Sequence, residues 1–437
     1  MGVNRRQFLL GGLAAAATTM GLVGCAPGSG GSSGEEGGGD GAVDLQFAWW
    51  GNDVRNKNTQ AAIDVYMKAN PNVKIAPQPG EFASYWDKLA TQTAGGTSPD
   101  VVQMDMNYIA EYGNRQALLD VSKVDVSKFA EGTVDSGKIN DQLVGINAGV
   151  NSALIFANPA IFEKAKMDLP DDTTWTWDSM IEISAEVAAK AGVPFGIVQA
   201  FASDAFFGAF LRQNGKALFT PDGLAFEAAD AQAWFDLMVK AQKAKAIGTA
   251  QQISEEGSSG SGKAIDLAAL ATGKTAMQYY NSNQLPAVTT AAGSELVLLR
   301  FPSLTGKATD RKAWYKASML WSASAKTKNP DAVVALIDWW VNSPECAAIN
   351  LTERGVPCNT EILAEIKPKL DKTQQAVVKY IEDIKPELAD TPIAPPPGGG
   401  KLGDIMFRYQ TDVLFEKSST AEAAQKFVDE LKSNLQG

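Results

Sequence analysis

The order of apolar and polar side chains predicts strands and helices in regular alternation along most of the chain. Residues 43–50 first alternate apolar and polar side chains and then become continuously apolar, which is typical of a strand entering a covered sheet. A helix over 53–69 that starts at an asparagine or aspartate cap and a strand over 73–76 follow. A helix over 85–93 and a strand over 100–104 come next. Because strands that alternate with helices pair in parallel, we expect a doubly wound lobe of the α/β class.

The same alternation continues toward the C-terminus. Strands are expected near 150–157 and over 275–280, and helices over 159–166 and 177–191. The end of the chain is helical apart from a proline- and glycine-rich loop at 391–400. The roughly 390 residues after the N-terminal segment are enough for two domains of ordinary size.

Residues 1–24 have the pattern of a signal peptide rather than of a folded element. Arg5 and Arg6 precede an apolar run over 8–23 that is short for a membrane span. The paired arginines resemble a twin-arginine export signal. Ordinary secretion remains open, because Asn4 stands where that signal prefers Ser or Thr.

Residues 25–41 predict a lipid anchor followed by a flexible linker. The segment 22–25 is similar to a bacterial lipobox, in which Cys25 is acylated and becomes the mature N-terminus. Residues 26–41 are mainly Gly, Ser, Glu and Asp and cannot bury a core. We therefore expect an extracytoplasmic lipoprotein held at the outer face of the cytoplasmic membrane, with a soluble secreted protein as the alternative.

Composition limits the chemistry that is available. The chain has no histidine, so Ser-His-Asp, Cys-His and histidine-zinc sites are excluded and no metal is expected. An enzyme would depend on carboxylate, lysine or tyrosine chemistry. The net charge of -11 disfavours nucleic acid, because phosphate binding needs a basic face. The glycine-rich segment 257–264 nearly matches a phosphate-binding loop, but Ala264 replaces the required hydroxyl, so no cofactor is expected.

Cys346 and Cys358 lie close together in the sequence. In an oxidising compartment they predict a disulfide that joins the helix expected before residue 350 to the segment after it. The alternative is a pair of buried free thiols.

Aromatic and amide residues recur where predicted strands end. In open α/β sheets, ligands lie beyond the carboxyl ends of the strands. Sugars present apolar C–H faces and many hydroxyls, so their sites need flat rings together with amides, carboxylates and guanidinium groups. The residues of these types at strand ends include Trp49, Trp50, Asn52, Asp105, Asn107, Tyr108, Tyr279, Tyr280, Asn281 and Trp321. For each ring alone, core packing is the alternative, and for Asp105 it is a helix cap.

Five segments resemble the carbohydrate-binding branch of ABC transporter extracellular solute-binding proteins, the relatives of maltose-binding protein. These segments are 49–56, 85–105, 175–178, 273–277 and 353–357, and they follow the family's order over nearly the whole exported part of the chain. One departure is Cys358, where relatives commonly carry alanine, which puts the geometry after Pro357 in doubt.

The resemblance implies a two-lobed periplasmic-binding-protein fold of the type II-like kind. Each lobe is expected to hold a doubly wound, mostly parallel sheet. One lobe would comprise 42–148 plus 281–317 and the other 149–280 plus 318–437. Three hinge crossings are expected, near 147–152, 279–281 and 317–321.

The resemblance also assigns candidate ligand contacts. Arg354 suits this role because a guanidinium can bridge adjacent hydroxyls, and its alternative is an ion pair with Glu353 or Glu345. The full set of expected contacts is Trp50, Asn52, Tyr85, Asp105, Tyr279, Trp314, Trp321 and Arg354.

The function that follows from the resemblance is capture of a mono- or oligosaccharide for an ABC importer. The protein would act as a monomer, catalyse no reaction and pass its sugar to the membrane permease. Two alternatives stay open: a binding protein for an amino acid, peptide or polyamine, and an exported carbohydrate-active enzyme that uses a carboxylate pair.

Overall fold

The computed structural model describes residues 41–221, 223–259 and 262–435. The predicted signal peptide, Cys25 and almost all of the predicted linker lie outside these residues. Within the described ranges, no helix combines the length and the apolar character needed to cross a bilayer.

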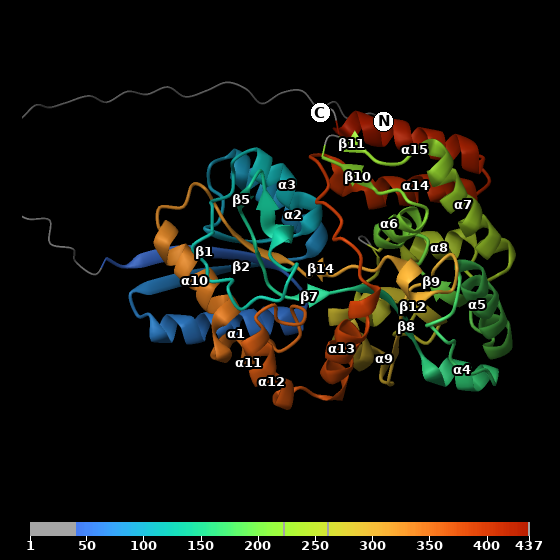
Figure 1. The fold of residues 1–437 in the computed structure, drawn as a ribbon, viewed down its shortest axis with the longest axis horizontal. Coiled ribbons are helices and arrows are strands. Elements are labelled where there is room, and N and C mark those ends of the chain that lie inside the picture. Colours follow the sequence, from blue (N-terminus) through green and yellow to red (C-terminus); the bar gives the residue numbers. More distant parts are fainter. Residues whose placement is uncertain (1–40, 222, 260–261, 436–437) are drawn as a thin grey trace, which may run out of the picture. The chain divides into compact units, whose positions relative to one another are not determined.

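The first sheet has five strands in the order β2-β1-β3-β15-β6 (Figure 1). Strand β1 pairs in parallel with β2 and β3, whereas β15 runs antiparallel to β3 and β6. The bounds are β1 Val43–Trp50, β2 Val73–Gly80, β3 Val101–Met104, β6 Ile146–Asn147 and β15 Leu320–Ala323. Its helices are α1 Asp53–Ala69, α2 Phe82–Ala94, α3 Met106–Asn114, α10 Pro330–Asn342 and α11 Pro344–Asn350.

The two faces of this sheet bury different apolar clusters. Leu45, Phe47 and Trp49 pack with α1 and α10, whereas Ala48 and Trp50 pack with α2 and α3. In Figure 1, α1 and α11 lie below β1 and β2, and α2 and α3 lie above them. The alternation seen in residues 43–50 therefore serves a sheet that helices cover on both sides.

The second sheet has four strands in the order β13-β8-β12-β9. Only β12 and β9 pair in parallel, and β8 runs antiparallel to both β12 and β13. The bounds are β8 Ala153–Ala157, β9 Phe195–Val198, β12 Thr275–Asn281 and β13 Val297–Leu299. Both sheets are therefore mixed, and less parallel than expected, because β15 and β8 each run against a neighbour.

Helices surround the second sheet and provide most of its core. The C-terminal helices belong here, since Phe427 and Leu431 are fully buried in the same cluster as Trp234 and Phe206. The bounds are α4 Pro159–Ala165, α5 Trp177–Ala191, α6 Asp204–Gln213, α7 Ala228–Lys243, α8 Ala250–Glu256, α9 Leu285–Ala292, α12 Thr360–Ile366, α13 Lys372–Asp383, α14 Leu402–Leu414 and α15 Thr420–Leu435. Short hairpins are β4 Lys138–Ile139 with β5 Gln142–Leu143, and β10 Phe219–Thr220 with β11 Gly223–Leu224.

The chain passes between the sheets at three places. The first is 147–153, where β6 leads through β7 (Val150–Asn151) into β8, and the second is 316–320, where β14 (Lys316–Ala317) leads into β15. Strands β7 and β14 pair with each other and lie between the two sheets in Figure 1. The third crossing is 350–357, between α11 of the first lobe and α12 of the second.

Two predicted details of the lobes are wrong. The crossing expected near 279–281 lies inside β12, between β8 and β9 of the second sheet. The segment 281–317 contributes β13 to the second sheet, while β15, assigned to the other lobe in the predicted boundaries, completes the first. The reason is that a strand's own sequence shows that it is buried but does not identify its partner.

Candidate functional site

Aromatic rings gather where β1 and β3 end in the first lobe. The ring of Trp50, the last residue of β1, lies 5.4 Å from Phe82 and 5.3 Å from Trp86. Trp86 stacks on Tyr108 with 3.8 Å between centroids and 17° between ring planes. We call Trp50, Phe82, Tyr85, Trp86 and Tyr108 the aromatic cluster. Of the rings predicted from the sequence, Trp50, Tyr85 and Tyr108 are brought together here.

Tyr85 belongs to this cluster but points into the lobe. Its hydroxyl donates a hydrogen bond to the carbonyl of Gln103 at 2.8 Å, and the side chain is buried. Burial raises the pKa of the Tyr85 hydroxyl well above its usual value. The residue therefore supports the strand ends from beneath.

Asp105 follows β3 and has two partners. One carboxylate oxygen accepts from the backbone N–H of Asn107 at 2.9 Å, which makes Asp105 the N-cap of α3. The other oxygen forms an ion pair with Lys316 Nζ at 3.3 Å. Lys316 lies on β14, in the second crossing. The side chain of Asp105 therefore caps α3 and at the same time forms an ion pair with a crossing strand.

The second lobe contributes Asp204 to the same place. Asp204 begins α6, and its carboxylate lies 3.5 Å from the side-chain amide of Asn107 in the first lobe. Burial raises the pKa of Asp204, the nearby Lys316 lowers it, and the charge of Asp105 raises it. Lys316 of the crossing strand thus pairs with Asp105 of the first lobe and also acts electrostatically on Asp204 of the second.

The proline- and glycine-rich loop of the second lobe lies against this group. A Cβ added to Gly400 would lie 2.6 Å from the carbonyl oxygen of Asn107 and 3.4 Å from the ring of Tyr108. Ala394 packs on the first lobe's apolar cluster that contains Trp50. We call the group where the lobes meet the interlobe site; its members are Trp50, Asp105, Asn107, Tyr108, Asp204 and Lys316.

Sequence reasoning missed two of these residues, Asp204 and Lys316. Asn107 and Tyr108 carry a signal, because they directly follow Asp105 at a strand end. Asp204 and Lys316 carry no local signal, since each becomes part of the site only through the meeting of the lobes.

Three of the predicted contacts lie apart from the interlobe site within the first lobe. Trp321 is fully buried, with its ring 4.9 Å from Phe47 and 5.0 Å from Trp340. Arg354 is 3% exposed and donates to Gln103 and Thr59. Asn52 is exposed and caps α1, accepting from the N–H of Arg55 at 3.0 Å.

Register explains the position of Trp321. Leu320 faces the cluster that contains Trp50, so the next residue must face the opposite side of the sheet. Neither expected role of Arg354 is found: the side chain is not at the lobe surface, and Glu353 pairs with Arg55 instead, at 2.8 Å.

Tyr279 and Trp314 belong to the core of the second lobe. The ring of Tyr279 lies 5.0 Å from Phe206, and burial raises the pKa of its hydroxyl, with a further contribution from Asp204. Trp314 is 8% exposed and has the guanidinium of Arg212 over its ring at 5.3 Å. Of these two, only Tyr279 borders the interlobe site.

The predicted disulfide is not formed, because Cys346 and Cys358 are free thiols. Each packs into a different apolar cluster, Cys346 with the first lobe and Cys358 with α12 and α13. Burial raises the pKa of both thiols to about 12. The alternative of two buried thiols is the one found.

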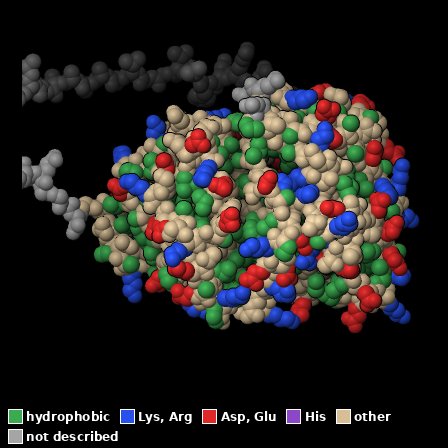
Figure 2. Space-filling view, in the orientation of Figure 1, with side chains coloured by type: hydrophobic (Ala, Val, Ile, Leu, Met, Phe, Trp, Pro, Cys, Tyr) green, Lys and Arg blue, Asp and Glu red, His purple; other side chains and the backbone are tan. Residues whose placement is uncertain are grey.

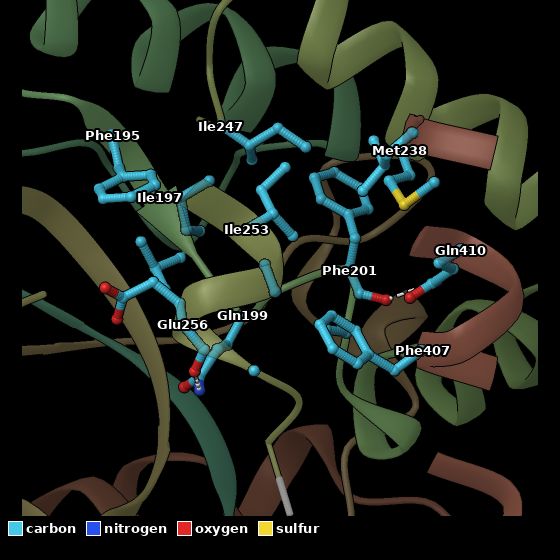
Figure 3. A pocket seen from close by; sticks show the side chains of 15 residues that line it. Phe195, Ile197, Gln199, Phe201, Met238, Ile247, Ile253, Glu256, Phe407 and Gln410 are labelled. Atoms are coloured by element: carbon cyan, nitrogen blue, oxygen red, sulfur yellow. Dashed lines mark hydrogen bonds between the residues drawn. The ribbon is translucent and has the colours of Figure 1, made fainter. Parts of the chain in front are cut away.

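Two small, partly open pockets of about 30 Å³ each lie elsewhere. The first lies inside the second lobe among Phe195, Ile253, Phe201 and Phe407, beside the hydrogen bond from Gln410 to the carbonyl of Phe201 (Figure 3). The second lies beside the third crossing. Either could hold a water molecule or two, and both are too small for a sugar.

Charged groups of both signs are mixed on the face of the molecule seen in Figure 2. Figure 2 shows Asp and Glu interspersed with Lys and Arg over the visible face rather than a basic region. Among the described residues, no group of three or more Asp, Glu or Cys side chains is arranged to hold a metal ion.

Comparison with known proteins gives the family. A profile of bacterial extracellular solute-binding proteins matches residues 50–345. The arabinooligosaccharide-binding protein of Bacillus subtilis is 25% identical over 45% of this chain and 45% of its own length. The lactose-binding protein of Rhizobium radiobacter is 31% identical over 37% of this chain and 40% of its own. The chain thus matches less than half the length of these two relatives.

A solved structure shares the fold. The periplasmic oligogalacturonide-binding protein of Yersinia enterocolitica, in complex with saturated digalacturonic acid, superposes with a TM-score of 0.78 at 19% identity. The match covers 90% of this chain and 100% of that one. From the profile match over most of its length and this two-lobed fold, the chain belongs to the bacterial extracellular solute-binding protein family.

Proposed function

We propose that this chain is the extracytoplasmic solute-binding component of an ABC importer and that it holds a mono- or oligosaccharide at the interlobe site. Cys25 would carry the lipid that keeps the protein at the outer face of the cytoplasmic membrane. The protein would act as a monomer, catalyse no reaction and deliver its sugar to the permease.

The observation that carries the proposal is the make-up of the interlobe site. Tyr108 provides a half-buried ring that stacks on the buried Trp86, and Asp105, Asp204 and Lys316 bring charged hydrogen-bonding groups from both lobes and a crossing. Flat rings suit the C–H faces of a sugar, and carboxylate and ammonium groups suit its hydroxyls. The names of the relatives support the same class, since each one names a carbohydrate.

Binding would work by closure of the lobes. In an open form, a sugar would reach the first lobe at Trp50 and Asp105. The closed form would be favoured only by the contacts that the sugar also makes with the second lobe, at Asp204. Closure of this kind is a hinge motion, in which a few residues of the crossings absorb the change in backbone angles, as in periplasmic binding proteins.

A thermal-shift and calorimetry screen of the purified protein tests the proposal. The probes are lactose, arabinotriose, maltotriose and digalacturonate, with glutamate, a tripeptide and spermidine for the other solute classes. At least one sugar should raise the melting temperature, because a ligand selective for the folded state stabilises it. A response only to a non-sugar probe would replace the sugar assignment, and release of shorter sugars would establish the enzyme.

A lysine variant locates the site. Lys316→Met should weaken the affinity for the sugar identified in the screen at least about tenfold, because one charge-assisted hydrogen bond is lost. Lys263→Met is the matched control, because Lys263 also pairs with a buried carboxylate, that of Glu256 at 2.7 Å, but lies within the second lobe. Equal affinities for wild type and Lys316→Met would place the sugar elsewhere.

A further inference from the structure

The third crossing contains a dipeptide, Glu353-Arg354, with contacts in both lobes. The carboxylate of Glu353 accepts from Arg55 Nε at 2.8 and 3.1 Å, and Arg55 belongs to α1 of the first lobe. The backbone carbonyl of Glu353 accepts from the side-chain amide of Asn283 in the second lobe, at 3.1 Å. One residue therefore joins the two lobes through its two ends.

The side chain of Arg354 reaches into the first lobe. Its guanidinium donates to the side-chain carbonyl of Gln103 and to the hydroxyl of Thr59, the latter at 2.6 Å, and lies 4.6 Å from the ring centroid of Trp321. These partners are all neutral. Because a buried charge without a carboxylate partner is costly, Arg354 is poorly explained as a device for stability alone.

Gln103 connects Arg354 to the interlobe site. It lies two residues before Asp105 on β3, and its side-chain amide donates to the carbonyl of Trp50 at 3.3 Å. Arg55 also donates to that carbonyl, at 3.4 Å. The strand ends that carry Trp50 and Asp105 are thus bound from below by the partners of Glu353 and Arg354.

The backbone of Arg354 touches the other two crossings. Its carbonyl accepts from the hydroxyl of Ser318 in the second crossing. A Cβ added to Gly149, in the first crossing, would lie 2.4 Å from the same carbonyl oxygen. Val150 and Val356 then exchange backbone hydrogen bonds at 2.7 and 2.8 Å. All three crossings meet at this one peptide.

We propose that Glu353 and Arg354 are positioning residues that couple the strand ends of the interlobe site to the three crossings. A movement of the lobes then changes the positions of Trp50 and Asp105. In return, a ligand in the interlobe site changes the position of one lobe relative to the other. The functional meaning of this coupling rests on the proposed function, but the coupling itself is a property of the ligand-free protein.

Interlobe distances in the absence of sugar test the coupling. Spin labels are attached to Lys57→Cys on α1 and Asp236→Cys on α7, both exposed positions, in the full chain with Cys25→Ser. Cys346 and Cys358 are buried and should not react in the folded protein. Glu353→Gln keeps the side-chain shape and removes the ion pair. The fraction of molecules at the interlobe distance seen in the structure should fall about fivefold. This is the effect expected from the loss of a partly buried ion pair.

Asp172→Asn is the matched control. Asp172 pairs with Arg300, and the two side chains are 14% and 16% exposed, compared with 16% and 12% for Glu353 and Arg55. Its pair lies within the second lobe, so the distance distribution should stay unchanged. Arg354→Lys, which keeps the charge but not the planar fork, should shift the distribution in the same direction as Glu353→Gln.

The outcomes are separable from those of the sugar screen. An unchanged distribution in folded Glu353→Gln overturns the coupling, as does an equal shift in Asp172→Asn. Because no sugar is present, a negative screen leaves this result intact. If Arg354→Lys fails to fold, Glu353→Gln still decides the question.

Discussion

Trp50 and Trp321 show how one residue's direction decides its role. Both lie on central strands of the first sheet, and both were expected to contact the ligand. Trp50 faces α2 and the aromatic cluster, whereas Trp321 faces α10 and is fully buried between Phe47 and Trp340. The residue type suits a sugar site at both positions, but only Trp50 faces the side of the sheet on which the interlobe site lies.

We therefore expect Trp321→Ala to act on stability. Removing this ring from a closed core should lower the free energy of unfolding by about 3–5 kcal/mol, measured by urea denaturation. Trp339 is only half-buried, and its ring packs against Tyr66. Trp339→Ala should therefore lower the free energy of unfolding clearly less. A stable Trp321→Ala protein with at least tenfold weaker sugar binding would instead support the role first expected from the sequence.

At the scale of elements, the crossings depend on glycines that no apolar pattern marks. Gly355 has a φ of +93°, and an added Cβ would lie 2.8 Å from both the carbonyl carbon of Gly149 and the carbonyl oxygen of Val150. Only glycine allows the first and third crossings to approach this closely. The segment 350–357 contains no regular strand, which is why periodicity did not identify it as a crossing.

Gly355→Ala should separate the effect of this contact from that of backbone strain alone. The left-handed conformation costs about 1–3 kcal/mol for alanine, and the clash with backbone atoms adds to it. Gly273→Ala is the control, because Gly273 has a φ of +68° with no described heavy atom within 4 Å of the added Cβ. Thermal or urea unfolding should show the larger loss for Gly355→Ala. Equal losses would mean that the crossings can separate at little cost.

At the scale of the whole molecule, acidic groups of both lobes face each other. Asp105 of the first lobe pairs with Lys316, and burial together with the charge of Asp105 raises the pKa of Asp204 of the second lobe, although Lys316 lowers it. The folded protein therefore holds the proton of Asp204 more tightly than the unfolded chain does.

The sign of the resulting pH dependence is fixed. A raised pKa means that the folded state binds the proton more tightly than the unfolded state, so stability falls as the pH rises from about 3.8, the ordinary value, through the raised pKa. The slope for one group is at most about 1.4 kcal/mol per pH unit. Over this range, we expect the unfolding free energy of the wild type to fall relative to that of Asp204→Asn. A difference that does not change with pH would show that Asp204 titrates normally.

Local signals predicted the elements well and their partners poorly. The helix expected over 53–69 is α1 at the same bounds, capped by Asn52, and the strand over 43–50 is β1. Caps and periodicity act through near neighbours, so they can be read locally. Sheet membership depends on partners hundreds of residues away, and the exchange of β13 and β15 between the predicted lobes follows from that.

The sequence by itself determined the α/β class, the exclusion of histidine chemistry, the family and the strand-end rings around Trp50 and Asp105. Only the tertiary structure decided that Asp204 and Lys316 join them, that Arg354 lies beneath the site, and that Cys346 and Cys358 are free thiols. The physical reason is that a residue's chemistry and its helical or strand period are properties of the local chain. Proximity between the lobes is set by packing among segments that share no local pattern.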